Sequence, residues 1–227
     1  MKKYSEELGR CPLFHNVSEQ DLPLMLDCLE AKTISYRAEN VLLAEGEPAG
    51  YVGIVLSGSV RIVRDDYWGN RSIVAEIGPS ELFGESFACA GLSEIPVSVI
   101  AVRDVEVMLI DCMKLTHSCS HACAFHQQLI QNLLKILAQK NLLFHQKIAV
   151  TSKRTTREKL TAYLLMQAKE HHNNRFEIPF NRQELADYLE VDRSGLSVEI
   201  GKLIKLGFIE ADKKSFHIIK AMDASCS

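Results

Sequence analysis

Hydrophobic residues follow one period in the first half of this chain and another in the second half. From about residue 33 to residue 111, apolar and β-branched residues form short runs or alternate with polar ones, as in β-strands. The runs are Ile34–Tyr36, Val52–Leu56, Val60–Val63, Ile73–Ala75, Val97–Val102 and Val105–Ile110. Because turns containing glycine separate these short runs, the pattern predicts a β-barrel or a β-sandwich.

Beyond residue 124 the pattern is that of a long helix. Neither glycine nor proline occurs from Ala124 to Thr151, and a heptad seam runs along this segment. Its members are Ile130, Leu134, Leu137, Asn141, Phe144 and Ile148. The seam fits either a dimer interface or one long buried helix. A second stripe, expected to face the chain's own strands, contains Leu129, Leu133, Ile136 and Leu143.

Length and composition fit two ordinary soluble domains. The chain has 227 residues, of which 47% are hydrophobic and 24% are charged. No apolar run reaches the roughly 20 residues needed to cross a bilayer, and no secretory signal begins the chain, so we expect a cytoplasmic protein. Residues 1–150 carry 13 Lys and Arg against 18 Asp and Glu, whereas residues 151–220 carry 13 against 10. The basic excess in the second part suits contact with phosphates.

Further helices are predicted before the strand region and after the long helix. Residues 5–30 form short helical segments whose predicted apolar face contains Leu22, Leu24, Met25, Leu26 and Leu29. After residue 151, helices are predicted at Arg157–Lys169, Arg182–Leu189 and Arg193–Lys205, and two strands are predicted around a turn at Lys213 and Lys214. Three helices followed by a strand pair are typical of a winged helix-turn-helix, in which the charged turn is the wing.

The segment from Asn181 to Leu203 is the most informative about function. Asn181 can cap its first helix in a capping box with Glu184, and Asp192 can cap its second helix. Ala186 is small enough for the second helix to cross close to the first. The alternative is an ordinary helical hairpin, but the caps, the short turn and the strand pair together favour DNA binding.

The second of these helices has one apolar face and one face of short side chains. Leu196, Ile200 and Leu203 share the face expected to dock into the domain. The residues assigned to base edges on the opposite face are Arg193, Ser194, Ser197 and Val198, and those assigned to phosphates are Arg182, Gln183 and Lys202.

Taken in this order, the motifs resemble the cyclic-AMP receptor/FNR (Crp/Fnr) family of bacterial regulators along nearly the whole chain. Residues 45–60 are similar to the glycine-bearing signature of cyclic-nucleotide-binding domains, and Phe83–Ser86 falls where that family has its phosphate-binding cassette. The resemblance implies an α+β fold with an N-terminal cyclic-nucleotide-binding-like β-barrel (a double-stranded β-helix or jelly roll), a long dimerisation helix and a C-terminal winged helix-turn-helix. The expected domains are residues 1–123, 124–151 and 152–227.

The cassette departs from that of the cyclic-AMP-binding members. Those members hold the cyclic phosphate with an arginine and a serine, and Pro96 and Val97 take these places here. Without a cation to neutralise a phosphate, cyclic AMP is not the expected effector. The effector-binding candidates are Gly84, Glu85 and Ser86, and the Glu85 carboxylate either accepts hydrogen bonds from a ligand hydroxyl or stabilises its own turn.

Two further departures concern the operator and iron. Ser194 and Val198 replace a glutamate and an arginine of the best-known members, so the operator sequence cannot be carried over. FNR-type oxygen sensors have a cysteine cluster near the N-terminus, whereas only Cys11 lies there in this chain and Cys28 lies farther on. An iron–sulfur cluster of that type is therefore not expected.

A second candidate site consists of Cys119, Cys123 and His126. Their i, i+4, i+7 spacing places them on one side of a helix, where they could bind zinc, iron or haem or form a redox pair. Structural zinc needs a fourth ligand, which His117 or His121 would have to supply. The alternative is that these cysteines are small core residues. The chain has 7 cysteines, and in a reducing compartment free thiols are expected.

These patterns predict a DNA-binding transcription regulator that responds to an unidentified small-molecule, redox or metal signal. The expected partners are double-stranded DNA with a palindromic operator, a second copy of the chain and RNA polymerase, but no membrane. The alternative is a thiol- or metal-dependent sensor or enzyme built on Cys119, Cys123 and His126. Because neither an oxyanion donor nor a phosphate-cradling loop is evident, an enzyme is not expected.

Overall fold

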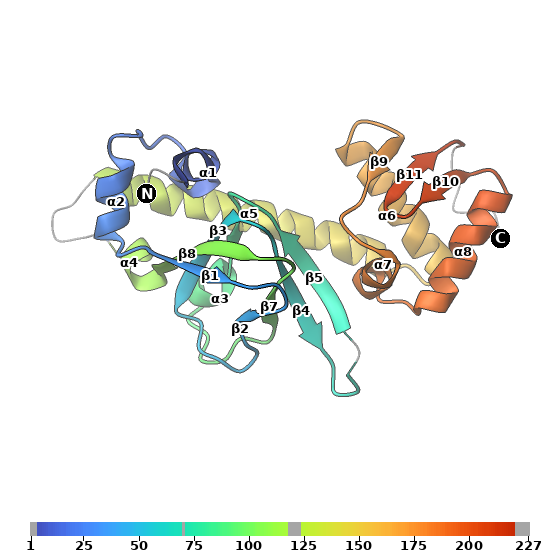
Figure 1. Cartoon of the computed structure of the whole chain (residues 1–227), viewed down its shortest axis with the longest axis horizontal. Helices are drawn as coiled ribbons and strands as arrows, with labels where there is room; N and C mark the ends of the chain where they lie inside the picture. The colour runs from blue at the N-terminus through green and yellow to red at the C-terminus, as the bar shows by residue number, and fades with distance from the viewer. Residues whose placement is uncertain (1–3, 70, 118–123, 221–227) are drawn as a thin grey trace. The chain divides into compact units, whose positions relative to one another are not determined.

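The computed structural model describes residues 4–69, 71–117 and 124–220, which divide into two compact units (Figure 1). The first unit is Met1–Asn141 and the second is Leu142–Ser227. One continuous helix, α5 (Ala124–Thr151), begins in the first unit and ends in the second. Its bounds agree with those of the long helix predicted at residues 124–151.

In the described part of the first unit, eight short strands lie in the sequence between the N-terminal helices and α4. Before α5, its elements are α1 (Ser5–Arg10), η2 (Pro12–Phe14), α2 (Leu22–Cys28), β1 (Lys32–Tyr36), β2 (Val41–Leu43), β3 (Tyr51–Ser57), β4 (Val60–Asp65), β5 (Arg71–Ile77), β6 (Leu82–Phe83), α3 (Glu85–Cys89), β7 (Ser98–Ala101), β8 (Val105–Asp111) and α4 (Cys112–Thr116). The six predicted strand segments correspond to β1, β3, β4, β5, β7 and β8.

The strands form a β-sandwich of two antiparallel sheets. One sheet has the strand order β1-β8-β3-β6 and the other has the order β2-β7-β4-β5. The two sheets remain separate in the part of the chain that the structure describes, so the predicted barrel is an open sandwich. The fold class is otherwise as predicted, with antiparallel strands, a long helix and a C-terminal helical unit.

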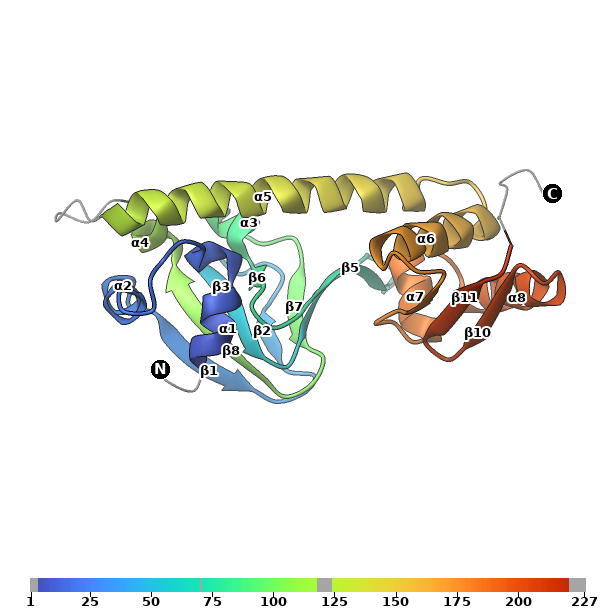
Figure 2. The same cartoon turned by 90° about the horizontal axis from the view of Figure 1, so that it is seen from above.

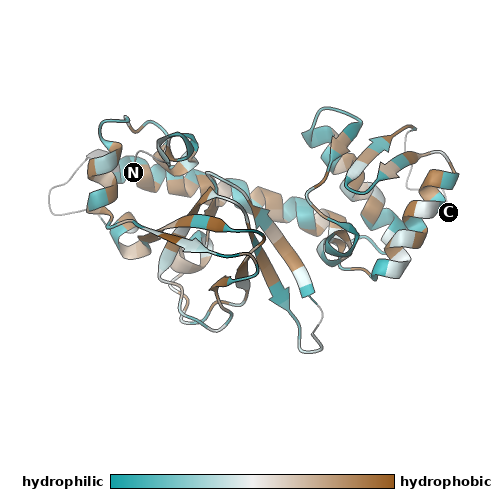
Figure 3. Ribbon diagram, viewed as in Figure 1, coloured by the Kyte–Doolittle hydropathy of each residue, from teal (hydrophilic) through white to brown (hydrophobic). Residues whose placement is uncertain are grey.

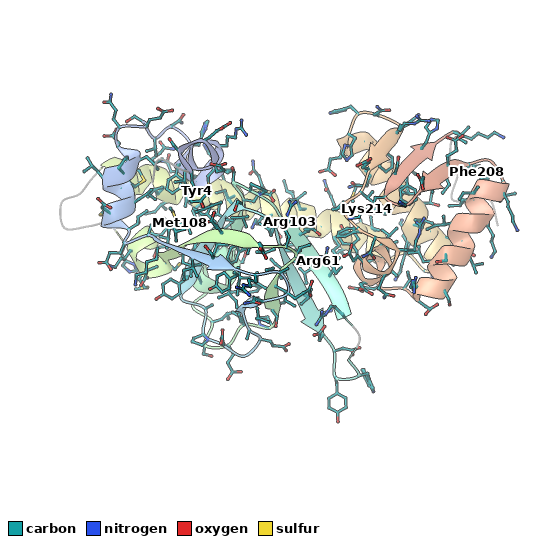
Figure 4. The ribbon with its side chains drawn as sticks, in the orientation of Figure 1. Tyr4, Arg61, Arg103, Met108, Phe208 and Lys214 are labelled. Atoms are coloured by element: carbon teal, nitrogen blue, oxygen red, sulfur yellow. The ribbon has the colours of Figure 1, made fainter. Side chains whose placement is uncertain are left out.

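Strand β3 is buried on both faces. Val55 belongs to the core between the two sheets, whereas Ile54 and Leu56 pack with the helices on the other side of their sheet. A Cβ atom on Gly53 would lie 2.1 Å from Cζ of Phe83, so this position has no room for a side chain. Burial on both faces explains why β3 reads as a continuous apolar run. In Figure 4 the side chain of Met108, from the neighbouring strand β8, lies within this unit.

Helix α5 packs on the sandwich through its predicted second stripe. Leu129, Leu133 and Ile136 are 0%, 3% and 5% exposed, and Figure 2 shows α3 and α4 beside this part of the helix. Asn132 is also buried, and its Nδ2 donates hydrogen bonds to the carbonyl oxygens of Leu13, at 2.9 Å, and His15, at 2.8 Å. These bonds hold α5 against the N-terminal segment.

Two residues do not lie where the sequence patterns place them. Leu143, assigned to the second stripe, is 55% exposed because it follows the end of the sandwich unit at Asn141. Leu24, assigned to the apolar face of residues 5–30, is 68% exposed. The buried face of α2 consists of Leu22, Met25 and Leu26, followed by Leu29, and Leu24 falls on the other side of this i, i+3, i+4, i+7 pattern.

The heptad seam lies on the surface of α5 in this single chain. Leu134 is 61% exposed, Phe144 is 39% exposed and Ile148 is 61% exposed, whereas Ile130 and Leu137 are partly buried. Asn141 is exposed among them. A single chain therefore leaves most of this apolar stripe in contact with water.

The second unit is a three-helix domain with a small sheet. Its elements after α5 are α6 (Thr156–Glu170), β9 (Arg175–Glu177), α7 (Arg182–Leu189), α8 (Arg193–Lys205), β10 (Ile209–Asp212) and β11 (Ser215–Ile218). The sheet has the order β10-β11-β9. The predicted bounds of α7 and α8 agree with the structure, and the predicted strand pair is β10 and β11. Strands β2, β6 and β9 were not predicted, since each has only two or three residues.

None of the described helices combines the length and the apolar character that crossing a bilayer requires.

Candidate DNA-binding surface and sensor site

Helix α7 begins with the predicted capping box. Oδ1 of Asn181 accepts hydrogen bonds from the backbone N–H groups of Gln183, at 2.9 Å, and Glu184, at 3.0 Å. Oε2 of Glu184 in turn accepts from the N–H of Asn181 at 2.6 Å. The turn to α8 passes through Glu190 in the left-handed conformation, with φ 55°. These local bonds fix where α7 starts and where α8 can begin.

Helix α8 is capped by Asp192, also as predicted. The Asp192 carboxylate accepts hydrogen bonds from the Ser194 hydroxyl and, at 2.9 Å, from the backbone N–H of Gly195. These two bonds lower the pKa of Asp192 below its ordinary value of 3.8, the Ser194 hydroxyl having the larger effect. The capped terminus orients the residues that follow it.

The two faces of α8 separate as the sequence predicts. Leu196, Ile200 and Leu203 are 0%, 4% and 2% exposed and pack into the domain. The opposite face exposes Arg193, Ser194 and Ser197, together with Val198, which is 56% exposed. In Figure 3, α8 changes between teal, white and brown along its length, as expected of a helix with one buried and one open face. A short-chained surface of this kind fits into a major groove.

The three residues predicted to contact phosphates have partners within the chain. The Arg182 guanidinium is half-buried and lies 5.4 Å from the centre of the Phe216 ring, and burial lowers its pKa. Gln183 donates to Asp187 at 2.8 Å, and Lys202 forms an ion pair with Glu199 at 2.6 Å. Gln183 and Lys202 are exposed, so contact with another molecule requires only an exchange of surface partners.

The predicted wing is the turn between β10 and β11. Lys213 takes the left-handed conformation there, with φ 49°, and is exposed. The Nζ of Lys214, labelled in Figure 4, donates a hydrogen bond to the carbonyl oxygen of Pro179. This contact ties the turn to the segment that precedes α7.

In the first unit, named the sensor unit for its expected role, the cassette residue Glu85 is buried and pairs with a lysine. Gly84 takes φ 77° immediately before α3, and Glu85, the first residue of α3, is 2% exposed. Oε1 of Glu85 lies 2.9 Å from Nζ of Lys140 on α5, and Ser86 Oγ donates to the same oxygen at 3.3 Å. Within the described chain, Oε2 of Glu85 has no hydrogen-bond partner. The carboxylate thus keeps one unused acceptor inside the protein.

Lys140 was not predicted as a site residue. Its ammonium also donates to the carbonyl oxygen of Leu82, so it bridges the cassette and α5. A signal for it exists in the sequence, because Lys140 follows Leu133 and Ile136 at the spacing of the stripe that faces the sandwich. Pro96 is exposed and Val97 is buried, and neither carries charge, so the two places expected to hold a phosphate offer no cation.

Of the predicted Cys119, Cys123 and His126 cluster, only His126 is described. It is 4% exposed, and its Nε2 lies 3.2 Å from the carbonyl oxygen of Lys114. Cys119 and Cys123 lie outside the described residues, as does His121. His117 is exposed, with Nδ1 3.1 Å from the carbonyl oxygen of Met113. Within residues 4–69, 71–117 and 124–220, no group of three or more His, Cys, Asp or Glu side chains is arranged to hold a metal ion.

Both units match families of known proteins. Residues 33–120 match the cyclic nucleotide-binding domain, and residues 158–224 match the Crp-like helix-turn-helix domain. The chain is 24% identical over 220 residues to the transcriptional activator protein FnrA of Stutzerimonas stutzeri, covering 94% of this chain and 86% of that protein. It is 31% identical over 104 residues to the cyclic AMP receptor protein of Thermus thermophilus, which covers 43% of this chain and 44% of that protein.

Solved structures share the same fold at low sequence identity. FixK2 from Bradyrhizobium japonicum has a TM-score of 0.65 and 22% identity, covering 84% of this chain and 93% of that chain. The c-di-GMP-responsive regulator CLP from Xanthomonas campestris has a TM-score of 0.69 and 17% identity, covering 87% of this chain and 98% of that chain. At this level of identity these structures show that the fold is shared.

Proposed function

Because this chain belongs to the Crp/Fnr family of transcription regulators, we propose that it acts as a homodimer that inserts one α8 helix per subunit into the major groove of a palindromic operator. The observation that carries this proposal is the exposed face of α8, which presents Arg193, Ser194, Ser197 and Val198 beside a buried apolar face. Arg193 suits a guanine edge, the serines suit base or phosphate oxygens, and Val198 suits a thymine methyl group.

In this proposal the remaining basic surface contacts the DNA backbone. Lys202 and Gln183 are exposed, and their present partners lie on their own helices. Exchanging a surface ion pair for a phosphate costs little, because exposed pairs contribute only about 0–1 kcal/mol. Arg182 contributes through the part of its guanidinium that is not covered by Phe216. Such contacts set the register of the protein on the duplex without reading sequence.

The exposed seam of α5 supports the homodimer. Leu134, Phe144 and Ile148 lie on one stripe of the helix and remain 39–61% exposed in the single chain. Pairing this stripe with that of a second copy would remove it from water, and Asn141 within the seam would fix the register of the pair. A symmetric dimer places its two α8 helices about one DNA turn apart, ~34 Å, and therefore selects a two-fold symmetric operator.

The experiment that tests DNA recognition starts from random sequence. The purified protein selects ligands from a library of duplexes, and fluorescence anisotropy then measures binding to the enriched sequence and to a shuffled duplex. We expect a palindromic consensus, preference for it by about 10³-fold or more, and affinity that falls steeply with salt. If no sequence is enriched and affinity equals that of the shuffled duplex, the proposal is wrong.

We further propose that the sensor unit binds a small molecule at Gly84, Glu85 and Ser86. The unused Oε2 acceptor of the buried Glu85 supports a ligand with a hydroxyl or amine donor. Cyclic AMP fits poorly, because Pro96 and Val97 leave its phosphate without a cation. A ligand that also presents an anionic group would compete with Glu85 for Lys140. Native mass spectrometry of the protein as isolated tests for a retained small molecule, and its absence in every preparation would count against the site.

In the proposed transmission of the signal, α5 contacts the cassette through one lysine and α7 through another. Lys140 of α5 pairs with Glu85 in the sensor unit, and Lys147 of α5 has its Nζ 4.7 Å from the centre of the Tyr188 ring on α7. A ligand that binds the two arrangements of this pair unequally would shift α5 and hence the helices that follow it. In this proposal the DNA-bound protein contacts RNA polymerase in the cytoplasm.

The proposed alternative signal is metal or redox chemistry at Cys119, Cys123 and His126. His126 is buried on the first turn of α5, close to the base of the seam. Elemental analysis of the purified protein tests this alternative, and we expect less than one equivalent of metal per chain.

A further inference from the structure

Two cysteines that are distant in the sequence meet at the base of the sensor unit. The Sγ atoms of Cys89 and Cys112 lie 3.6 Å apart, although 23 positions separate the residues along the chain. Cys89 is the last residue of α3, and Cys112 is the first residue of α4. A disulfide needs an S–S distance of about 2.05 Å, so the sulfurs must approach each other by roughly 1.5 Å.

The two thiols differ in their access to solvent. Cys89 is exposed, whereas Cys112 is 5% exposed and belongs to the core beneath α5. Burial raises the pKa of Cys112 to about 12, and partial loss of solvent around its sulfur also raises the pKa of Cys89. Both side chains are therefore thiols at neutral pH. An oxidant in solution reaches Cys89 first, with Cys112 held next to it.

Helix α3 connects this cysteine pair to the buried ion pair of the sensor. Glu85 and Cys89 are the first and last residues of α3, one helical turn apart, and therefore lie on the same face. Glu85 contacts Lys140 of α5 at one end, and Cys89 contacts Cys112 of α4 at the other. Closing the gap of about 1.5 Å would therefore move α3, the helix whose Glu85 pairs with Lys140, relative to α4.

We propose that Cys89 and Cys112 form an oxidation site, in which a peroxide converts the two thiols into a disulfide and thereby changes the affinity of the protein for DNA. The change in affinity rests on the proposed function, whereas formation of the disulfide does not. This pair is separate from the Cys119, Cys123 and His126 cluster considered from the sequence.

The chemistry requires one equivalent of hydrogen peroxide. The sulfur of Cys89, after losing its proton, attacks one peroxide oxygen, the O–O bond breaks, and hydroxide leaves with that proton as water. The sulfur of Cys112 then attacks the sulfenic acid sulfur, the S–S bond forms and the S–O bond breaks. The Cys112 proton leaves with the departing hydroxyl as a second water. The two sulfurs together lose two electrons, and the peroxide gains them.

Trypsin digestion reports the disulfide directly. Cleavage after Arg71, Arg103 and Lys114 places Cys89 in peptide 72–103 and Cys112 in peptide 104–114, each with a single cysteine. Cys119 and Cys123 fall in peptide 115–135. After treatment of the full-length protein with hydrogen peroxide and alkylation of remaining thiols, we expect a non-reduced species that joins 72–103 to 104–114 and that separates on reduction. Joining of 104–114 to 115–135 instead, or of neither, would overturn the proposed site.

The second measurement links the disulfide to function. Anisotropy with a duplex selected by the reduced protein is repeated after peroxide treatment, and we expect the dissociation constant to change by about fivefold or more and to recover with dithiothreitol. Cys89→Ser, on the surface, and Cys112→Ala should each abolish the change, whereas Cys28→Ser, at the end of α2, should retain it.

The two measurements separate the two claims. A disulfide with an unchanged dissociation constant would overturn the regulatory role. If the reduced protein selects no duplex, the proposed function has failed, and the peptide result still decides whether Cys89 and Cys112 are an oxidation site.

Discussion

At the scale of single residues, the most consequential contact is the ion pair between Glu85 and Lys140. The Glu85 side chain is 3% exposed and that of Lys140 is 20% exposed, so neither charge is solvated as it would be on the surface. A buried charge is stable only while its partner is present, and removal of one partner leaves the other without compensation. The pair therefore holds α5 on the cassette only while both members remain.

Replacing Lys140 with methionine should destabilise the sensor unit. We expect the free energy of unfolding to fall by about 3–5 kcal/mol, because Glu85 stays buried without a counter-charge. Urea denaturation followed by circular dichroism measures this change. Glu85→Met combined with Lys140→Met should recover most of the loss, since an apolar pair of similar volume is often neutral. Lys135→Met, at an exposed lysine of the same helix, should change stability by no more than about 0.5 kcal/mol. Equal effects of Lys135→Met and Lys140→Met would contradict this account.

At the scale of elements, α8 combines a cap, a buried face and the proposed recognition face within 13 residues. Asp192 fixes its start, and Leu196, Ile200 and Leu203 fix its rotation about its own axis. These constraints leave the direction of Arg193, Ser197 and Val198 determined by helix geometry alone. The proposed recognition surface is thus positioned by interactions between residues close together in the sequence.

The cap of α8 should make this helix sensitive to acid. The folded pKa of Asp192 is lowered, so its contribution to stability is fully present above the ordinary value of 3.8 and is lost as pH falls through the folded value. Amide hydrogen exchange of α8, corrected for intrinsic exchange rates, can be measured at decreasing pH in the native protein and in Asp192→Asn. The native protein should lose protection of α8 at a higher pH than Asp192→Asn does. Asparagine keeps the capping hydrogen bond without titrating in this range. Identical pH trends in the two proteins would rule the effect out.

Substitutions on α8 should separate base reading from phosphate binding. Arg193→Ala should weaken binding to the selected duplex by about 1–3 kcal/mol and relax the preference at the base pair that it contacts. Lys202→Ala should weaken all duplexes about equally and reduce the slope of log K against log salt by about 0.9 for each phosphate that the protein no longer neutralises. Anisotropy titrations over a salt series measure both effects. Lys32→Ala, on β1 of the sensor unit, is the matched control and should leave affinity and slope unchanged.

At the scale of the whole molecule, α5 contains the boundary between the two units, at Asn141 and Leu142. It packs on the sandwich through Leu129, Leu133 and Ile136, and it contacts α7 through Lys147. Another stripe of α5, the apolar seam with Leu134, Phe144 and Ile148, is exposed. The proposed assembly therefore uses one face of α5 for the sensor unit and another face for a second copy of the chain.

Charges placed in the seam should convert the proposed dimer into monomers. Leu134→Glu combined with Ile148→Glu would bring two pairs of like charges together at the interface, where burial of an unpaired carboxylate is costly. Sedimentation equilibrium should show a monomer, and affinity for the palindromic duplex should fall to that of a half-site. Leu142→Glu is a matched control, since Leu142 is 63% exposed but lies off the stripe. A dimer that survives the double substitution would place the interface elsewhere.

The sequence alone determined the features that depend on neighbouring residues. The bounds of α5, α7 and α8, the capping box of Asn181 and the two faces of α8 all follow from signals a few positions apart, because caps and hydrophobic periods act within one or two helical turns. Strands as short as β6 and β9 gave no such signal, since two or three residues show no period.

Only the tertiary structure decided the contacts that join distant segments. The buried pair of Glu85 with Lys140, the approach of Cys89 to Cys112 and the bonds from Asn132 to the N-terminal segment bring together residues from separate elements. It also decided that Leu143 is exposed and that the strands form an open sandwich. The physical reason is that these contacts depend on how the elements pack, and hydrophobic periodicity states which face is buried without stating which partner will cover it.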